Sequence, residues 1–147
     1  MQKITPFLWY NDQAEEAAKF YSSVFKNVKI LSYMGKPGQA MGVTVAIEGQ
    51  EFILFNGGPM FQFTPAFSLF VNAETQEEID ELWEKLCADG GMPSKCGWLQ
   101  DKYGVSWQII PPVLSELLNH PDRDKANRAM QAMLKMTKLI IKDLEEA

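Results

Sequence analysis

The chain has 147 residues, of which 46% are hydrophobic and 22% are charged, and its net charge is −5. This length is typical of one domain, and the hydrophobic content predicts a packed core, which excludes an intrinsically disordered chain. An acidic chain of this kind lacks the basic patch that nucleic-acid binding requires, so we expect no nucleic acid among its partners.

The N-terminus and the cysteines indicate a cellular location. The N-terminus lacks a charged region followed by an apolar run, and no segment approaches the roughly 18 consecutive apolar residues of a membrane span. The two cysteines, Cys87 and Cys96, are too few for a disulfide framework. We therefore expect a cytoplasmic protein that neither is secreted nor spans a membrane.

The first part of the chain predicts a strand, a helix and three further strands. Residues 3–10 alternate as a strand does, and Asp12 with Glu15 forms a candidate capping box for the helix that follows. Further strands are predicted at about 28–33, 41–48 and 51–56. The apolar face of the helix consists of Ala14, Ala17, Ala18, Tyr21 and Phe25.

The second part repeats this order after a connection that runs from Gly57 to Pro65. A strand is predicted at 66–71, and Thr75 to Glu78 forms a capping box for a helix that ends at Gly90-Gly91. A strand from Cys96, a tight turn at 101–104 and a strand at 105–110 follow. Gly104 suits the turn, and the two prolines after Ile110 cannot continue a ladder of hydrogen bonds.

After the second proline the sequence becomes helical. Residues 112–118 predict a short helix, and Asp122 begins a longer one. Three methionines lie on or near one face of it, which predicts packing in a core or a dimer, with an adaptable binding surface as the alternative. The helical spacing of the longer helix extends over Ala126, Met130, Met133, Thr137, Ile140 and Leu144.

Two pairs of segments in the chain have similar residue patterns. The stretch from Gly49 to Phe55 has the same layout as that from Gly104 to Ile110, 55 residues later, and Phe7–Phe25 corresponds to Phe67–Cys87. The spacing exceeds that of common solenoid repeats, so one internally duplicated domain is the simplest interpretation.

Three segments carry a resemblance to a known family: FNGGPMFQFTPAFSLFV, TQEEIDELW and CGWLQDKYGVSWQIIP. They resemble the PhnB-like branch of the vicinal-oxygen-chelate superfamily, which includes glyoxalase I, bleomycin-resistance proteins and extradiol dioxygenases. Members of this branch carry the label 3-demethylubiquinone-9 3-methyltransferase. The resemblance extends over nearly the whole chain, including the C-terminal helix.

The resemblance implies an α+β fold of two βαβββ modules whose sheets surround a cleft, usually in a homodimer. We expect one domain over residues 1–147, with the first module at about 1–58, the second at about 65–111 and C-terminal helices at about 112–145. A small-molecule ligand is the implied partner.

The resemblance also implies four metal-ligand positions, which fall on or next to Thr5, Ile53, Ala66 and Gln108. A divalent cation needs converging imidazole, carboxylate or thiolate groups, and this set does not provide them. Only Gln108 keeps a polar oxygen, and the single histidine, His120, lies between two predicted helices. We therefore expect no metal and no other cofactor.

These positions, extended with a period of two along each strand, divide the strand residues into two faces. The face opposite the cleft is apolar throughout, as a helix-covered face should be: Leu8, Phe52, Leu54, Phe67, Leu69, Val71, Trp107 and Ile109. The cleft face mixes aromatic and polar residues, which is typical of a pocket for a planar small molecule. The alternative is a cleft filled by its own aromatic side chains. The predicted ligand-binding residues are Phe7, Trp9, Phe55, Ser68, Phe70, Trp98, Ser106 and Gln108, with Glu51 and Ile110 on the same face.

Candidate catalytic residues are few. Glu51 is a candidate base if burial raises its pKa, and Gln108 is a candidate for positioning a substrate. Cys96 has no histidine near it in the sequence, which favours a structural role over a nucleophilic one. Asp101 is better explained as a turn residue than as a catalytic acid.

Three functions stay open at this point. One is a metal-independent enzyme that converts a small aromatic or carbonyl compound, and another is a non-catalytic binding protein like the drug-sequestering relatives. The third, implied by the label, is a methyltransferase that uses S-adenosylmethionine. The sequence has no glycine-rich turn between a strand and a helix, which counts against the third.

Overall fold

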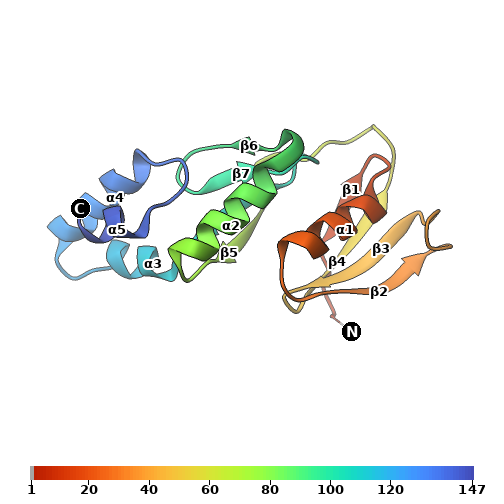
Figure 1. Cartoon of the computed structure of the whole chain (residues 1–147), viewed down its shortest axis with the longest axis horizontal. Coiled ribbons are helices and arrows are strands. Elements are labelled where there is room, and N and C mark those ends of the chain that lie inside the picture. The colour runs from red at the N-terminus through yellow and green to blue at the C-terminus, as the bar shows by residue number, and fades with distance from the viewer. Residues whose placement is uncertain (1) are drawn as a thin grey trace. The chain divides into compact units, whose positions relative to one another are not determined.

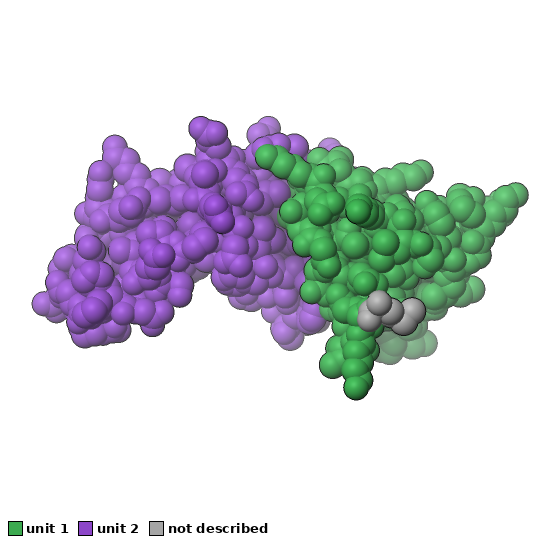
Figure 2. Space-filling model, turned by 90° about the horizontal axis from the view of Figure 1, so that it is seen from below, with its two compact units in different colours: residues 1–63 green, residues 64–147 purple. Residues whose placement is uncertain are grey.

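The computed structural model describes residues 2–147 and divides into two compact units, residues 1–63 and residues 64–147 (Figures 1 and 2). Each unit has one four-stranded sheet with a helix on one side, and the second unit carries additional C-terminal helices. The boundary lies inside the predicted connection between the modules. The predicted α+β fold of two βαβββ modules with a C-terminal helical extension is confirmed.

The first unit contains β1 (Phe7–Tyr10), α1 (Ala14–Val24), β2 (Val28–Met34), β3 (Gly42–Ile47) and β4 (Gln50–Asn56). The strands lie in the order β1-β4-β3-β2, with β1 parallel to β4 and the other pairs antiparallel. A parallel β1–β4 pair requires a crossover, and α1, β2 and β3 supply it.

Helix α1 covers one face of the first sheet (Figure 1). The apolar residues that strand alternation placed on this side are buried, as Leu8, Phe52 and Leu54 show with 3%, 6% and 1% exposure. Tyr10 and Tyr21 complete this core, and their hydroxyl oxygens lie 2.9 Å apart in a hydrogen bond. The opposite face therefore has no helix of its own unit on it.

The predicted capping box of α1 is wrong. The residue before the helix is Gln13, whose side chain makes no capping hydrogen bond, and the first helical N–H, that of Ala14, donates to Oδ1 of Asn56 over 2.8 Å. The Glu15 carboxylate instead accepts the N–H groups of Gly38 and Ala40, at 2.8 and 2.6 Å. A partner distant in sequence thus replaces the local cap, and Glu15 fixes the loop that joins β2 to β3.

The second unit contains β5 (Ser68–Asn72), α2 (Gln76–Cys87), the short 3-10 helix η1 (Ala88–Gly90), β6 (Met92–Pro93), β7 (Trp98–Gln100) and β8 (Ser106–Ile110). Its sheet has the order β5-β8-β7-β6, which repeats the topology of the first. Helix α2 begins as predicted, because Thr75 Oγ1 accepts the N–H of Glu78 over 3.1 Å.

The β7–β8 hairpin is organised by one buried carboxylate. Asp101, which is 2% exposed, accepts the N–H groups of Tyr103 and Val105 on Oδ1, at 2.9 and 3.1 Å. Its Oδ2 accepts the indole N–H of Trp107 over 2.9 Å. Gly104 has φ 90°, a conformation that glycine adopts without steric cost. These contacts agree with the prediction that Asp101 is a turn residue.

The C-terminal extension forms α3 (Pro112–Leu118), α4 (Arg123–Leu134) and α5 (Ile141–Glu145). The predicted single helix from Asp122 to Leu144 is wrong, because the helix ends at Leu134 and resumes only at Ile141. Residues 135–140 form a strap that bonds to the rest of the second unit. The carbonyl groups of Met136 and Thr137 accept the N–H groups of Cys96 and Gly97, each at 2.8 Å.

Long-range contacts outweigh helical periodicity in the strap. The Gln76 side chain donates to the carbonyl of Leu139 at 3.0 Å and accepts the N–H of Ile141 at 2.8 Å. Lys138 pairs with Asp80 at 2.7 Å, and this bond, followed by one from Gln76, holds the pKa of Asp80 below its usual value. The longest helices within residues 2–147 have 12 residues, too few to cross a bilayer.

Candidate functional site

The face of the first sheet that α1 leaves uncovered carries a cluster of four aromatic rings, which we call the aromatic cluster: Phe7, Trp9, Phe55 and Phe61. The Phe7 and Phe55 rings are 5.2 Å apart, and Trp9 lies edge-on to Phe55 and Phe61 at 5.8 and 5.1 Å. Phe7 and Phe61 remain 53% and 59% exposed. The structure thus brings together the three predicted binding residues of this unit and adds Phe61, which lies in the predicted connection from Gly57 to Pro65.

Trp9 is held in one position from two sides. Its indole N–H donates to the carbonyl of Gly58 over 2.9 Å. A Cβ atom on Gly57 would lie 2.1 Å from the Trp9 ring, so the backbone at residue 57 packs directly against the indole. The rings of Trp9 and Phe55 are half-buried among their own neighbours. The cluster is therefore a rigid apolar surface rather than an open hole.

Glu51 lies on the same face of the sheet as Phe55 and is half-buried. Its backbone is paired with the Gln2 side chain, which accepts the N–H of Glu51 and donates to its carbonyl oxygen, both at 3.1 Å. Gln2 thus uses its side-chain amide as a strand would use its backbone, and it fixes the end of β4 that carries the carboxylate.

The uncovered face of the second sheet carries the other predicted binding residues in two rows. One row crosses β5, β8 and β7 through Phe70, Gln108 and Trp98, and the next passes through Ser68 and Ser106. Gln108 donates its side-chain amide to Ser68 Oγ over 3.0 Å, which leaves its carbonyl oxygen able to accept a hydrogen bond. Phe70 is 56% exposed, whereas Ser106 is 1% exposed.

Two positions differ from their predicted faces. Ile110, expected on the ligand face, is only 7% exposed because it belongs to the apolar core of the C-terminal extension, with Leu114 and Leu117 of α3 and Leu139 of the strap. Phe67, expected under the helix, precedes β5 and is 51% exposed. The extension therefore closes the Ile110 end of this face, and Ser68, Phe70 and Gln108 form its open part.

The residues at the four implied metal positions do not fit a divalent cation. Thr5 and Ala66 lie outside the strands, Ile53 is apolar, and the Gln108 amide is bound to Ser68. Within residues 2–147 no group of three or more histidine, cysteine or acidic side chains is arranged to hold a metal. We therefore derive no chemistry through a metal at these positions.

The surroundings of the two cysteines are not those of a reactive thiol. Burial raises the pKa of the Cys87 thiol, which disfavours the nucleophilic thiolate. Cys96 adopts φ 58°, and its N–H donates to the carbonyl of Met136. Its place in the turn that binds the strap supports the structural role expected for it.

Comparison with known proteins shows which family the chain belongs to. The family model described as 3-demethylubiquinone-9 3-methyltransferase matches residues 2–110. The chain belongs to this family. The PhnB protein from Bacillus cereus, a solved structure, is 42% identical; the match covers 75% of this chain and 99% of that one, with a TM-score of 0.65. No match was found among curated proteins.

More distant structures share the fold. The fosfomycin resistance protein FosX from Listeria monocytogenes is 17% identical, with 79% of this chain and 97% of that chain covered and a TM-score of 0.58. A glyoxalase/bleomycin resistance protein from Albidiferax ferrireducens is 16% identical, with 71% and 93% covered and a TM-score of 0.52. The family member described here therefore has the vicinal-oxygen-chelate fold.

The family match ends at Ile110, so the expectation that the resemblance includes the C-terminal helix stays a prediction. The B. cereus protein is matched over 99% of its own length by 75% of this chain. Residues 111–147 therefore lie outside the part of the chain that the family model matches. Their contacts with Ile110 and Gly97 make them part of the second unit's core.

Proposed function

We propose that this family member binds a small, planar, partly apolar compound, an aromatic carbonyl compound being the best fit, on the uncovered faces of its sheets. The observation that supports this most directly is the exposure of Phe7, Phe61 and Phe70, each between 53% and 59%, on faces that also carry polar groups. Large aromatic side chains left exposed, as Phe7 and Phe61 are on one face of the first unit, are typical of ligand or partner surfaces.

The chemistry of the two faces supports the same class of ligand. On the first face, the aromatic cluster offers flat apolar surface on which a ring can stack. On the second, the Gln108–Ser68 pair offers a free amide oxygen, and the Ser68 hydroxyl hydrogen is available to donate to a carbonyl group. The first face thus suits a ring, and the second suits a ring that carries a carbonyl or hydroxyl group.

We propose that binding needs no metal, since the four implied positions lack suitable ligands. A structure of a FosX variant contains Mn(II) and a dihydroxypropylphosphonic acid, which are ligands of FosX. Methyl transfer, which the family name implies, calls for S-adenosylmethionine. The strand-to-helix connections here, 11–13 and 73–75, contain no glycine, so they do not fit the glycine-rich cradle of dinucleotide-type folds.

Native mass spectrometry of protein purified without chelator tests this proposal first, since it reports retained small molecules, metal and assembly state together. Acetophenone then serves as the probe in saturation-transfer NMR. Phe7→Ala should weaken binding because it removes exposed stacking surface, and Phe20→Ala, on helix α1, is the matched control. Equal binding by both variants, or a tightly held divalent ion in the purified protein, would contradict the proposal.

Turnover separates a binding protein from an enzyme. If the protein converts a bound compound, Glu51→Gln should abolish conversion and retain binding, because Glu51 is the carboxylate on the uncovered face of the first sheet. We also propose that the protein is a homodimer, as the resemblance implies. Light scattering at micromolar concentration should give twice the monomer mass, and a single species at monomer mass would contradict it.

A further inference from the structure

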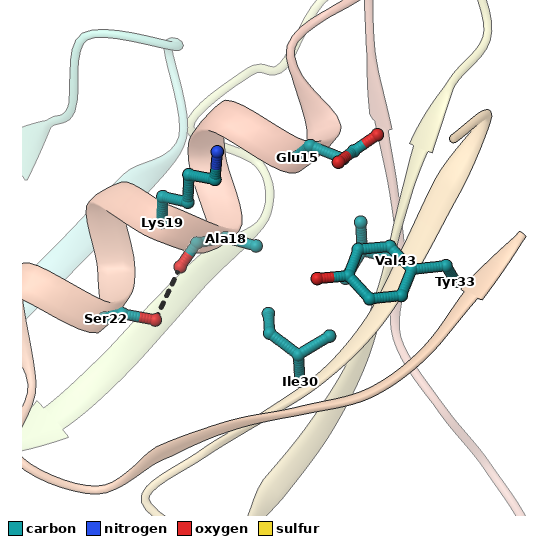
Figure 3. Close-up of a pocket in the computed structure, with 7 residues that line it drawn as sticks. All are labelled: Glu15, Ala18, Lys19, Ser22, Ile30, Tyr33 and Val43. Atoms are coloured by element: carbon teal, nitrogen blue, oxygen red, sulfur yellow. Dashed lines mark hydrogen bonds between the residues drawn. The ribbon is translucent and has the colours of Figure 1, made fainter. Parts of the chain in front are cut away.

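A separate pocket lies on the helix-covered side of the first sheet, opposite the aromatic cluster. It has a volume of about 170 Å³ and lies between α1 and the strands β2 and β3 (Figure 3). We call it the α1 pocket. Four residues line it from the helix and three from the strands: Glu15, Ala18, Lys19 and Ser22, and Ile30, Tyr33 and Val43.

The α1 pocket exists because the side chains that α1 presents here are small. Ala18 is 1% exposed and leaves space above the strands, so that Ile30 and Tyr33 stay 36% and 40% exposed even though they lie beneath a helix. A cavity of about 150 Å³ with an apolar lining is known to hold a benzene ring. The α1 pocket is of this size, and its floor of Ala18, Ile30 and Val43 is apolar.

The polar groups at its mouth are mostly hydrogen-bond donors. Glu15 and Lys19 are spaced i,i+4 on α1, an arrangement that usually gives an ion pair. Here both Glu15 oxygens accept backbone N–H groups of the β2–β3 loop, at 2.8 and 2.6 Å. Lys19 consequently has no hydrogen bond or ion pair with any residue in the described range 2–147. Lys19 lines the pocket, and its side chain extends along α1 with the ammonium group directed away from Ile30 and Tyr33 (Figure 3).

Tyr33 adds a second donor. Its ring lies across the pocket from the helix with the hydroxyl group directed toward α1 (Figure 3). The hydroxyl of Ser22 donates to the carbonyl of Ala18 over 2.9 Å, so its hydrogen is already committed. A ligand therefore meets the Tyr33 hydroxyl above an apolar floor, and the Lys19 ammonium becomes a second donor when the exposed lysine side chain turns toward the ligand.

We propose that the α1 pocket is a second binding site, which takes a small monocarboxylate with one ring or a short apolar chain. The apolar part fits the floor, and the carboxylate accepts from Lys19 and Tyr33. The neighbouring hollow of about 460 Å³ shares Lys19 and is also lined by Asp12 and Glu16. Together with Glu15, these carboxylates repel negative charge, and the repulsion is about twice as large for a dianion as for a monoanion, so dicarboxylates and phosphate monoesters should bind more weakly than monocarboxylates.

The experiment is fluorine NMR of 4-fluorobenzoate titrated with the full chain. We expect saturable binding in the millimolar range, and Lys19→Gln should weaken it about tenfold because a charge-assisted hydrogen bond is lost. Lys29→Gln is the matched control: Lys29 lies next to Ile30 on β2 and pairs with Ala46, on the uncovered side of the sheet. This variant removes the same charge and should leave binding unchanged. Ser22→Leu, which fills the pocket from the helix side, should abolish binding.

The proposal is independent of the proposed function, and the variants distinguish the two. Loss of 4-fluorobenzoate binding in Phe7→Ala, with Lys19→Gln unaffected, would place the compound on the aromatic cluster and overturn the α1 pocket. Absence of saturable binding, or equal weakening by Lys19→Gln and Lys29→Gln, would also overturn it. Equally tight binding of 4-fluorophthalate would refute the inferred preference for one negative charge.

Discussion

The carboxylate of Asp101 gives the sharpest test of how the β7–β8 hairpin is held. It is 2% exposed and accepts three hydrogen bonds, two from backbone N–H groups on Oδ1 and one from the Trp107 indole on Oδ2. In Asp101→Asn, the side-chain oxygen can keep the two hydrogen bonds from the backbone. The side-chain NH2 group then takes the place of Oδ2 and faces the Trp107 N–H, so that two donors meet without an acceptor. A buried donor left without an acceptor costs about 1–3 kcal/mol, so we expect the free energy of unfolding to fall by about 2 kcal/mol.

Asp101→Ala removes both acceptor oxygens and with them all three hydrogen bonds, and we expect a loss of about 4 kcal/mol, a large share of the 5–15 kcal/mol typical of a domain. Urea unfolding followed by far-UV circular dichroism measures both losses, because this signal is independent of the tryptophans. Asp143→Asn is the charge-matched control, since Asp143 is exposed on α5. It should change stability by less than about 0.5 kcal/mol.

A double-mutant cycle with Trp107→Phe isolates the indole bond. Phenylalanine has no N–H group, so the asparagine NH2 no longer faces a donor. The double variant should then be about 1–2 kcal/mol more stable than the sum of the two single losses predicts. Additive losses would refute the inferred contact between Asp101 and Trp107 as a source of stability. Loss of ligand conversion in Asp101→Asn without loss of stability would instead make Asp101 a functional residue.

Three further predictions concern other contacts. Gly57→Ala places a methyl group 2.1 Å from the Trp9 ring, so it should lower the free energy of unfolding in urea by about 1–3 kcal/mol. It should also weaken acetophenone binding, and unchanged binding would mean that the position of Trp9 is unimportant for the ligand. Gln76→Ala removes both side-chain bonds to the strap and should raise amide exchange at Ile141 by at least tenfold, as measured by NMR. Because its ion pair lowers the pKa of Asp80, that pair stabilises the fold above the unfolded pKa of about 3.9 and is lost as the pH falls through the lower folded value. Asp80→Asn should therefore reduce stability at neutral pH by at most about 0.5 kcal/mol, since both side chains are partly exposed, and should have no effect at pH 2.

The sequence predicted the two sheets well because strand alternation is a local signal. Period two, counted from the positions that the family resemblance implies, placed Leu8, Phe52, Trp107 and Ile109 under the helices, and each is at most 6% exposed. The hairpin turn was predicted from Gly104 for the same reason, since the turn conformation depends on a single residue. Features set by neighbours in sequence could thus be derived without a structure.

The errors share one physical cause, which is competition from partners far along the chain. Glu15 has the right spacing for a capping box, but two loop N–H groups bind it, and the cap comes from Asn56, 42 residues away. The helical spacing from Asp122 to Leu144 is interrupted because Gln76 binds the strap across 63 and 65 residues. Phe61 was not assigned to the site because a connection has no period from which a face can be derived.

The C-terminal extension decides which part of the second sheet can meet a ligand. Its apolar side chains bury Ile110, and Gly97 has no room for a side chain there, because a Cβ atom would lie 2.8 Å from Ile110 and 3.1 Å from Leu139. A buried isoleucine or leucine contributes about 1.5–3 kcal/mol, so a chain that ended at Ile110 would lose a substantial part of this unit's stability. The extension is therefore part of the fold and not a tail. Because it closes the Ile110 end, a ligand on this sheet has to approach at Phe70 and Gln108, where the exposed ring and the free amide oxygen lie.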